Sequence, residues 1–84
     1  RYGGEEFVVL LPETTTEQAQ IILTRLQRKL SEGLFLHEER NVLVTFSAGV
    51  TACGPGESIE EVLERADRAL YEAKRTGKNR TCVA

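Results

Sequence analysis

The sequence predicts a single α+β unit with the order strand–strand–helix–strand–helix–strand. A continuous apolar run, FVVLLP at residues 7–12, and a period-two alternation over residues 42–53 are both typical of strands. Two further segments repeat apolar residues at the helical spacing, each after a capping pattern. The chain has 84 residues without an internal repeat or linker, so one small domain is expected.

The composition is that of a globular protein, with 40% hydrophobic and 29% charged residues. Acids and bases are interleaved at a net charge of −2, which argues against nonspecific binding to nucleic acid or membrane surfaces. Because the chain starts with arginine inside a predicted strand, we expect further residues upstream. Cys53 and Cys82 lie in apolar segments without a Cys/His cluster, and are expected to be reduced, largely buried thiols rather than zinc ligands.

The first strand pair is expected at the N-terminus. Arg1 and Tyr2 would end one strand, and Gly3 and Gly4 would form the tight turn, because glycine adopts positive φ angles readily. Residues 7–12 would form a strand buried on both faces and closed by its proline.

The first helix is expected to begin at a capping box formed by Thr14 and Glu17, and to end before Gly33. Its predicted buried stripe consists of Ala19, Ile22, Leu23, Leu26 and Leu30. Residues 34–41 are expected to form a loop, either plain or with a small hairpin.

A strand is predicted over residues 42–53, where Ser47 and Gly49 keep one face small enough for a helix to approach closely. Ser58 and Glu61 form the capping box of the second helix, which Gly77 ends. A short final strand, RTCVA, follows at residues 80–84. The predicted buried stripe of this helix consists of Ile59, Val62, Leu63, Ala66, Ala69, Leu70 and Ala73.

Glu5 and Glu6 are adjacent acids beside a glycine turn. A carboxylate pair next to bare glycine backbone suits Mg²⁺ and a phosphorylated ligand, because oxygen ligands bind Mg²⁺ and glycine lets a bulky ligand approach the main chain. Taken alone, these residues fit a hairpin turn that carries two solvated acids at least as well.

Three segments decide between these readings: RYGGEEF, VTFSAGV and ADRALYEAKRTGKNR. In this order and at these separations they resemble the C-terminal half of the GGDEF family, the bacterial diguanylate cyclases, with GGEEF as a variant of its signature. Two positions depart from the family pattern: Ala48 stands where a larger residue is usual, and Lys78 stands where arginine is frequent.

The resemblance implies a ferredoxin-like palm, as in nucleotide cyclases, with residues 1–84 as the C-terminal part of a single domain. It implies an enzyme that condenses two GTP molecules into cyclic di-GMP and two pyrophosphates. A homodimer would bring the two GTP molecules together, so that each 3′-hydroxyl attacks the α-phosphate of the other. Mg²⁺ or Mn²⁺ would be the cofactor.

The resemblance also implies residue roles. Glu5 would be a metal ligand and the leading candidate for proton acceptor, and Glu6 would assist as a second catalytic and metal-binding acid. Gly3 and Gly4 would admit the ribose and α-phosphate. Lys74 and Lys78 would bind the terminal phosphates of GTP, and Arg25 would take part in product inhibition. Three residues would have structural roles: Phe7 in the core, Asp67 in a hydrogen bond or ion pair, and Tyr71 in packing on the sheet.

In the family the domain begins upstream of this chain, and the absent half supplies another metal-binding aspartate and the residues that read guanine. We therefore expect the fragment alone to be inactive. The domain is expected to be cytoplasmic, downstream of a sensory domain, in a parent protein that is either soluble or membrane-anchored. The alternative function is a degenerate GGDEF domain that senses GTP or cyclic di-GMP.

Overall fold

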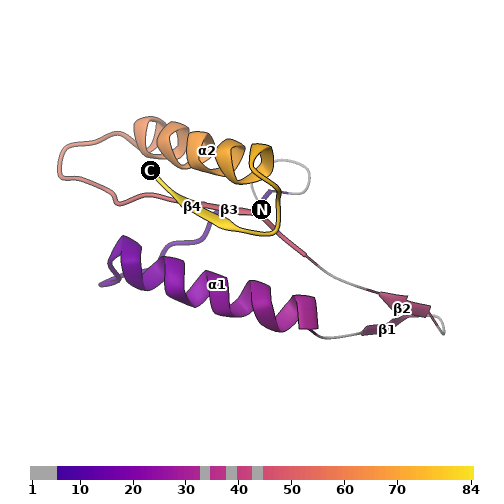
Figure 1. Cartoon of the computed structure of the whole chain (residues 1–84). Helices are drawn as coiled ribbons and strands as arrows, with labels where there is room; N and C mark the ends of the chain where they lie inside the picture. The colour runs from indigo at the N-terminus through magenta and orange to yellow at the C-terminus, as the bar shows by residue number, and fades with distance from the viewer. Residues whose placement is uncertain (1–5, 33–34, 38–39, 43–44) are drawn as a thin grey trace.

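The computed structural model describes residues 6–32, 35–37, 40–42 and 45–84. Strands β3 and β4 pair in parallel, with Ala48 opposite Thr81, and helices α1 and α2 cover the two faces of this small sheet (Figure 1). Because α2 connects the paired strands, they form a β–α–β unit. The elements are α1 (Thr16–Glu32), β1 (Phe35–His37), β2 (Arg40–Val42), β3 (Ala48–Val50), α2 (Ile59–Arg75) and β4 (Thr81–Val83).

Helix α1 begins one residue later than its predicted capping box. The Thr15 main-chain N–H donates to Gln18 Oε1 at 2.9 Å, and the Gln18 N–H donates to Thr15 Oγ1 at 3.1 Å. This reciprocal pair is a capping box with glutamine in place of glutamate. The prediction of Thr14 and Glu17 is therefore wrong by one position, and the Thr14 hydroxyl instead donates to the Pro12 carbonyl at 3.0 Å.

The face of α1 that meets the sheet differs from the predicted stripe. Ala19 and Gln27 are buried, whereas Ile22 and Leu26 are 50% and 46% exposed. Gln27 donates from Nε2 to the Phe46 carbonyl at 3.1 Å and accepts a hydrogen bond from the Thr81 hydroxyl at 3.1 Å. One buried amide thus joins the helix to the strand β4 and to the segment before β3, and part of the apolar face of α1 stays uncovered.

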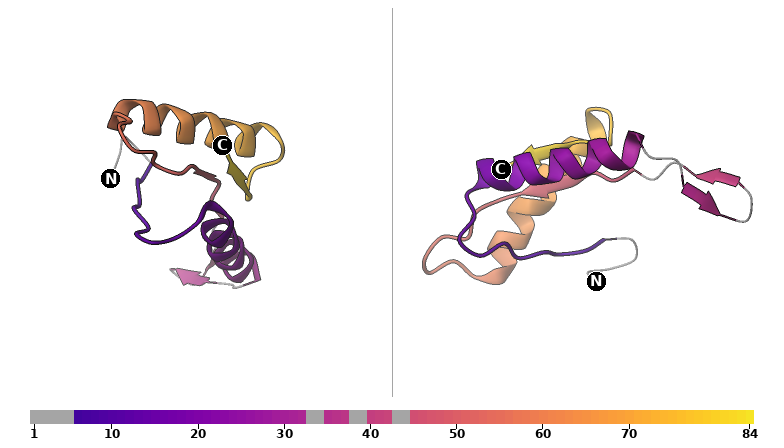
Figure 2. Two further views of the ribbon diagram at one scale, coloured as in Figure 1. Left: turned by 90° about the vertical axis from the view of Figure 1, so that its left-hand side faces the viewer. Right: turned by 90° about the horizontal axis from the view of Figure 1, so that it is seen from below.

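The segment between α1 and β3 contains a small hairpin, which was one of the two possibilities expected from the sequence. Strands β1 and β2 pair antiparallel, with Phe35 opposite Val42, and extend beyond the C-terminal end of α1 (Figure 2). The strand predicted over residues 42–53 is consequently too long. Val42 belongs to the hairpin, and β3 is limited to Ala48–Val50, where β4 supplies a partner.

Gly49 allows α2 to pack directly against β3. A Cβ atom at this position would overlap the main-chain oxygen of Ala66 and the main-chain nitrogen of Leu70, and would lie 2.9 Å from the Leu70 Cα. The contact is therefore between strand backbone and helix backbone, as expected from the small residues at 47 and 49. Val62, Ala69 and Ala73 complete the buried side of α2. Ile59, the first residue of the predicted stripe, is 56% exposed, so the prediction is wrong there: the contact with the sheet begins one turn later.

Both ends of α2 agree with the sequence. At the start, Ser58 Oγ accepts a hydrogen bond from the Glu61 N–H at 3.2 Å. At the end, Gly77 has a φ of +135°, and the Lys78 N–H returns to the Ala73 carbonyl at 2.9 Å. Lys78 is the second residue after the cap residue Thr76, and its bond back to Ala73 is the hydrogen bond of a Schellman motif that spans five residues.

An arginine-centred network fixes the loop before α2. Arg65 donates to both carboxylate oxygens of Glu57 at 2.6 and 2.9 Å, to Thr51 Oγ1 at 2.7 Å and to the Ala52 carbonyl at 2.6 Å. Glu57 also accepts from the Gly54 N–H at 2.6 Å. The hydrogen bonds from Arg65, and then that from Gly54, lower the pKa of the Glu57 carboxyl from 4.5 to about 2.

This network predicts a specific loss of stability in acid. Glu57 binds protons more weakly in the folded state, so its contribution is complete above about pH 4.5 and is lost as the pH falls toward 2. We expect Glu57→Gln to flatten the decline of the unfolding free energy across this window. Glu60→Gln removes the same charge from the first turn of α2 and should leave the slope near that of the parent. Thermal unfolding at a series of pH values, with identical slopes for the two variants, would contradict the assignment.

The apolar run at residues 7–12 forms no strand among the described residues. Phe7, Val9 and Leu10 are 70%, 72% and 73% exposed, so the predictions of a buried strand and of a core role for Phe7 are wrong for this chain. The physical reason is that a strand needs a neighbour to satisfy its main-chain groups, and no described strand lies beside it. The partner expected at residues 1–2 lies outside the described residues.

Cys53 and Cys82 are free thiols, as expected, but Cys53 is exposed and Cys82 is half-buried, so the expectation of largely buried thiols is wrong. Across the described ranges, neither helix has the length and apolar character needed to cross a bilayer.

Candidate functional site

A cavity of about 360 Å³ brings together residues from the two ends of the sequence. Glu6, the second acid of the signature, lines it together with Lys74 from the last turn of α2. The other lining residues all come from α2: Glu64, Asp67, Arg68, Leu70 and Tyr71. An acid near the start of the chain and a base near its end therefore share one cavity.

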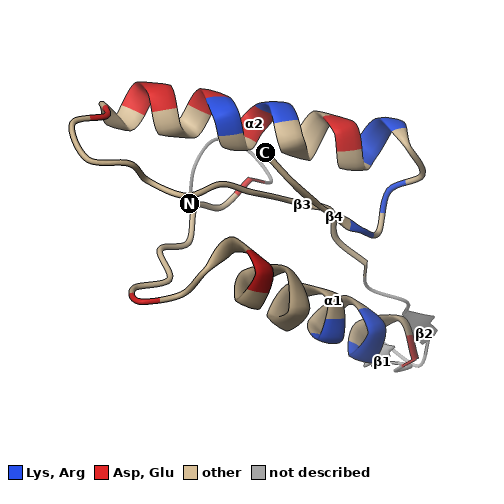
Figure 3. Ribbon diagram, turned by 60° about the vertical axis from the view of Figure 1, so that its left-hand side comes forward, with Lys and Arg blue, Asp and Glu red and all other residues tan. Residues whose placement is uncertain are grey.

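Helix α2 orders the charges along this cavity. Asp67, Tyr71 and Lys74 are separated by four and three residues, which places them one above another on the same side of a helix. Acidic residues gather toward the N-terminal end of α2, and Lys74 and Arg75 lie in its last turn (Figure 3). A site with carboxylates and an ammonium group can hold a cation and an anionic group at the same time.

Two α2 residues differ from their expected structural roles. Tyr71 is 66% exposed and lines the cavity, so the prediction that it packs on the sheet is wrong for this chain. Asp67 is exposed, and the ion pairs formed within the described ranges are Arg65–Glu57 and Arg75–Glu72, neither of which includes it. Both residues occupy the cavity wall rather than the core.

The remaining predicted site residues are Gly3, Gly4, Glu5, Lys78 and Arg25. Gly3, Gly4 and Glu5 lie outside the described residues. Lys78 lies in the turn after α2, because the helix ends at Arg75, and it does not line the cavity with Lys74. The assignment of both lysines to the terminal phosphates stays a prediction. Arg25 is exposed on α1.

The carboxylates that line the cavity are of the type that binds Mg²⁺, because Mg²⁺ prefers oxygen ligands. Among residues 6–32, 35–37, 40–42 and 45–84, no three acidic, histidine or cysteine side chains are grouped closely enough to hold a metal by themselves. Glu6 would need the neighbouring Glu5, or acids from outside this chain, to complete a coordination shell.

The family profile described as "Diguanylate cyclase, GGDEF domain" matches residues 1–80. The chain belongs to the GGDEF family. The match covers the whole signature and all the residues that line the Glu6–Lys74 cavity, and it ends at Arg80, directly before β4.

Among curated relatives, this GGDEF chain is 48% identical over 84 residues to diguanylate cyclase DgcP of Pseudomonas aeruginosa. It is 38% identical over 85 residues to diguanylate cyclase A of Treponema denticola. The alignments cover all of the present chain but only 12% and 23% of those two proteins.

Solved structures of GGDEF domains share its fold. The GGDEF domain of DgcB from Caulobacter crescentus, in complex with c-di-GMP, matches with a TM-score of 0.89 at 35% identity. The active GGEEF domain of a diguanylate cyclase from Vibrio cholerae matches with a TM-score of 0.79 at 34% identity. Each match covers 99% of the present chain and 50% or 53% of the other, so this chain spans about half the length of those structures. The prediction of a cyclase palm fold is confirmed.

Proposed function

We propose that the intact domain containing this chain is a diguanylate cyclase, which converts two GTP molecules into cyclic di-GMP and two pyrophosphates. The observation that carries the proposal is the shared cavity of Glu6 and Lys74. It places a signature carboxylate, suited to a metal and a reacting hydroxyl, near an ammonium group suited to phosphates. The names of the relatives and the c-di-GMP bound to the Caulobacter domain support the same reaction class.

In the proposed reaction the 3′-oxygen of one GTP forms a bond to the α-phosphorus of the other, while the bond from that phosphorus to the pyrophosphate oxygen breaks. The hydroxyl proton leaves to a carboxylate, for which Glu5 is the leading candidate and Glu6 the assisting acid. Gly3 and Gly4 would leave room for the ribose and α-phosphate. Two such transfers close the ring, so two half-sites of a homodimer are needed, each with one GTP.

We propose that Glu5 and Glu6 hold a divalent metal, Mg²⁺ or Mn²⁺. When bound, the ion would supply positive charge that stabilises the phosphoryl oxygens. Lys74 would bind the terminal phosphates from the end of α2, and Lys78 would approach them from the turn after it. The ligands that read guanine and an additional metal-binding acid are proposed to come from outside these 84 residues, so the fragment alone would be inactive.

Three further proposals follow from the same reaction. Arg25, exposed on α1, would take part in inhibition by cyclic di-GMP, because a guanidinium can bind both a guanine edge and a phosphate. The domain would work in the cytoplasm, where GTP is available. An upstream sensory domain would control its activity.

Lys74→Ala is expected to weaken binding of an unreactive GTP analogue about tenfold while leaving GMP binding nearly unchanged. The reason is that GMP lacks the terminal phosphates that the ammonium group is proposed to contact. Arg75→Ala is the matched control, because it removes a neighbouring charge that pairs with Glu72 and does not line the cavity. Calorimetric titration of the intact domain measures both ligands, and equal losses for GTP analogue and GMP would make Lys74 a structural residue only.

A further inference from the structure

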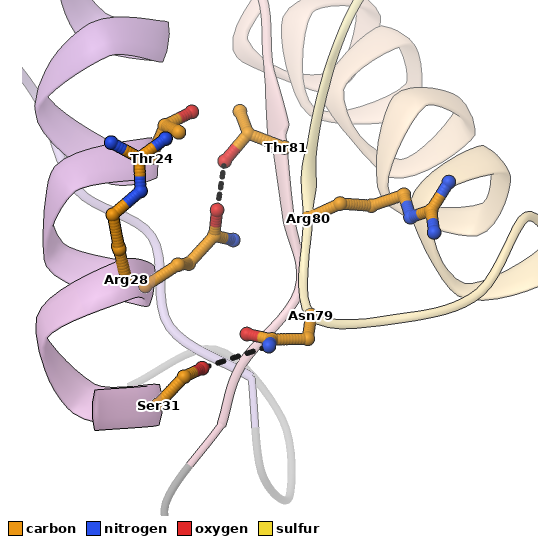
Figure 4. A pocket seen from close by; sticks show the side chains of 7 residues that line it. Thr24, Arg28, Ser31, Asn79, Arg80 and Thr81 are labelled. Carbon is orange, nitrogen blue, oxygen red and sulfur yellow. Dashed lines mark hydrogen bonds between the residues drawn. The ribbon is translucent and has the colours of Figure 1, made fainter. Parts of the chain in front are cut away.

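A second cavity lies between α1 and the start of β4 and has a volume of about 380 Å³ (Figure 4). Thr24, Arg28 and Ser31 line it from α1, and Asn79 and Thr81 line it from the chain around the start of β4. None of its described lining residues is acidic or a large apolar side chain. It contains neither Glu6 nor Lys74, so it is separate from the proposed cyclase site.

The walls of this cavity are held by hydrogen bonds that join distant parts of the chain. Asn79 donates from Nδ2 to Ser31 Oγ at 2.9 Å and from its main-chain N–H to Ser47 Oγ at 3.1 Å. The Thr81 hydroxyl donates to the buried Gln27, which closes the floor. The cavity is therefore formed by the tertiary structure rather than by loosely placed surface side chains.

Most of the hydrogen-bonding groups that remain available in this cavity are donors. Among the described residues, Ser31 Oγ accepts from Asn79 and its hydroxyl proton has no acceptor, and one of the two amide protons of Asn79 Nδ2 is used. The guanidinium of Arg28 adds up to five N–H donors beside Thr24 (Figure 4). A cavity lined by unused donors and a positive charge suits an anion with several acceptor oxygens.

Arg28 is the cation that faces this cavity. In the part of the chain that the structure describes, the ion pairs belong to Arg65 and Arg75, and Glu32, one turn after Arg28, is not within ion-pair distance of it. Arg80 also borders the cavity, but its Nε donates to the Lys78 carbonyl at 3.2 Å and its side chain extends away from α1 (Figure 4). The positive charge that contacts a ligand in this cavity would thus come from Arg28.

We propose that the cavity between α1 and β4 binds the phosphoryl group of a small soluble molecule, held by Ser31 and Asn79 together with Arg28, whose exposed side chain turns from Thr24 toward them on binding. A phosphoryl group offers several strong acceptor oxygens and negative charge, which match the guanidinium and the free hydroxyl and amide donors. The lack of large apolar residues in its lining fits a small polar molecule better than a lipid surface. The proposal does not depend on the cyclase reaction.

The test is titration of the intact domain with inorganic phosphate, followed by the NMR signals of the Asn79 side-chain amide. These signals should shift with saturation in the parent, and Arg28→Gln should weaken the apparent affinity about tenfold. Lys29→Gln removes the same charge from the adjacent position of α1, which does not line the cavity, and should change the affinity by less than about twofold. If Arg28→Gln does not fold, as judged by circular dichroism, Arg28→Lys serves instead, with a smaller loss expected.

An Asn79 amide that does not respond to phosphate in the parent would overturn the proposal. Equal weakening by Arg28→Gln and Lys29→Gln would also overturn it, because the effect would then be one of diffuse surface charge. A parallel arm uses vesicles of phosphatidylcholine with phosphatidylglycerol. Binding to these vesicles through Arg28 without an Asn79 response to free phosphate would assign the cavity to lipid and reject the soluble ligand.

Discussion

Glu5→Gln in the intact domain is expected to lower the rate of cyclic di-GMP synthesis by at least about a hundredfold while the domain stays folded. The substitution keeps the size and one oxygen ligand but removes the negative charge and the ability to accept a proton. Both are required of Glu5 if it binds the metal and receives the proton of the attacking hydroxyl. The neighbouring Glu6 keeps its carboxylate in the shared cavity with Lys74, so the variant tests the first acid alone.

The matched control for this experiment is Glu17→Gln, the same chemical change in the first turn of α1 and outside the cavity. Product chromatography with Mg²⁺ and GTP measures the rate, and circular dichroism measures the fold. Turnover of Glu5→Gln equal to that of the parent would remove Glu5 from the catalytic site. A variant that loses its fold would show that Glu5 is needed for structure, contrary to the expectation.

Gly49→Ala is expected to destabilise the intact domain by about 3 kcal/mol, at the upper end of what overpacking usually costs. The new methyl group would overlap the main-chain atoms of Ala66 and Leu70, and backbone cannot move aside as a flexible side chain can. To relieve the overlap, α2 must move away from β3, which would also expose the buried Val62 and Ala69. Denaturant unfolding of the two proteins measures the loss.

Gly54→Ala is the control for this prediction. The atoms nearest to its added Cβ would all belong to the Glu57 side chain, with Oε1 at 2.7 Å, and a side chain can rotate away. A smaller loss is therefore expected, through weakening of the Arg65–Glu57 network. Equal stability of Gly49→Ala and the parent would show that α2 does not approach β3 as closely as described.

Features determined by neighbouring residues could be predicted from the sequence. The Ser58 cap, the glycine at the end of α2 and the small residue at position 49 follow from local geometry or from the size of one side chain. The buried Val62, Ala69 and Ala73 follow from helical period alone. These are the elements in which the sequence analysis and the structure agree.

Features that depend on distant partners could not be predicted in this way. The run at residues 7–11 has strand composition, yet it forms no strand among the described residues because composition supplies no hydrogen-bonding neighbour. On α1, Ile22 and Leu26 fit the helical period, but the narrow sheet covers Ala19 and Gln27 instead. Ala19, Leu23 and Gln27 are four residues apart and so lie on one side of the helix. This side was not predicted to be the buried one because Gln27 is polar.

The site was predicted by resemblance rather than by local pattern. Nothing in the spacing of Glu6 and Lys74 requires them to share a cavity, but the family motifs pointed to both, and the structure places both there. The same motifs grouped Lys78 with Lys74, but Lys78, in the turn after α2, does not line the cavity. Arg65 was missed because its partners, Glu57 and the segment at residues 51–54, are brought to it only by folding.

The most direct test of the proposed function is to incubate the intact domain with GTP and Mg²⁺ and to identify the products by chromatography. We predict one cyclic di-GMP for every two pyrophosphates, at a rate that rises more steeply than the protein concentration because two half-sites must meet. GTP that binds but is not consumed would contradict the account and favour a GGDEF domain that only senses the nucleotide.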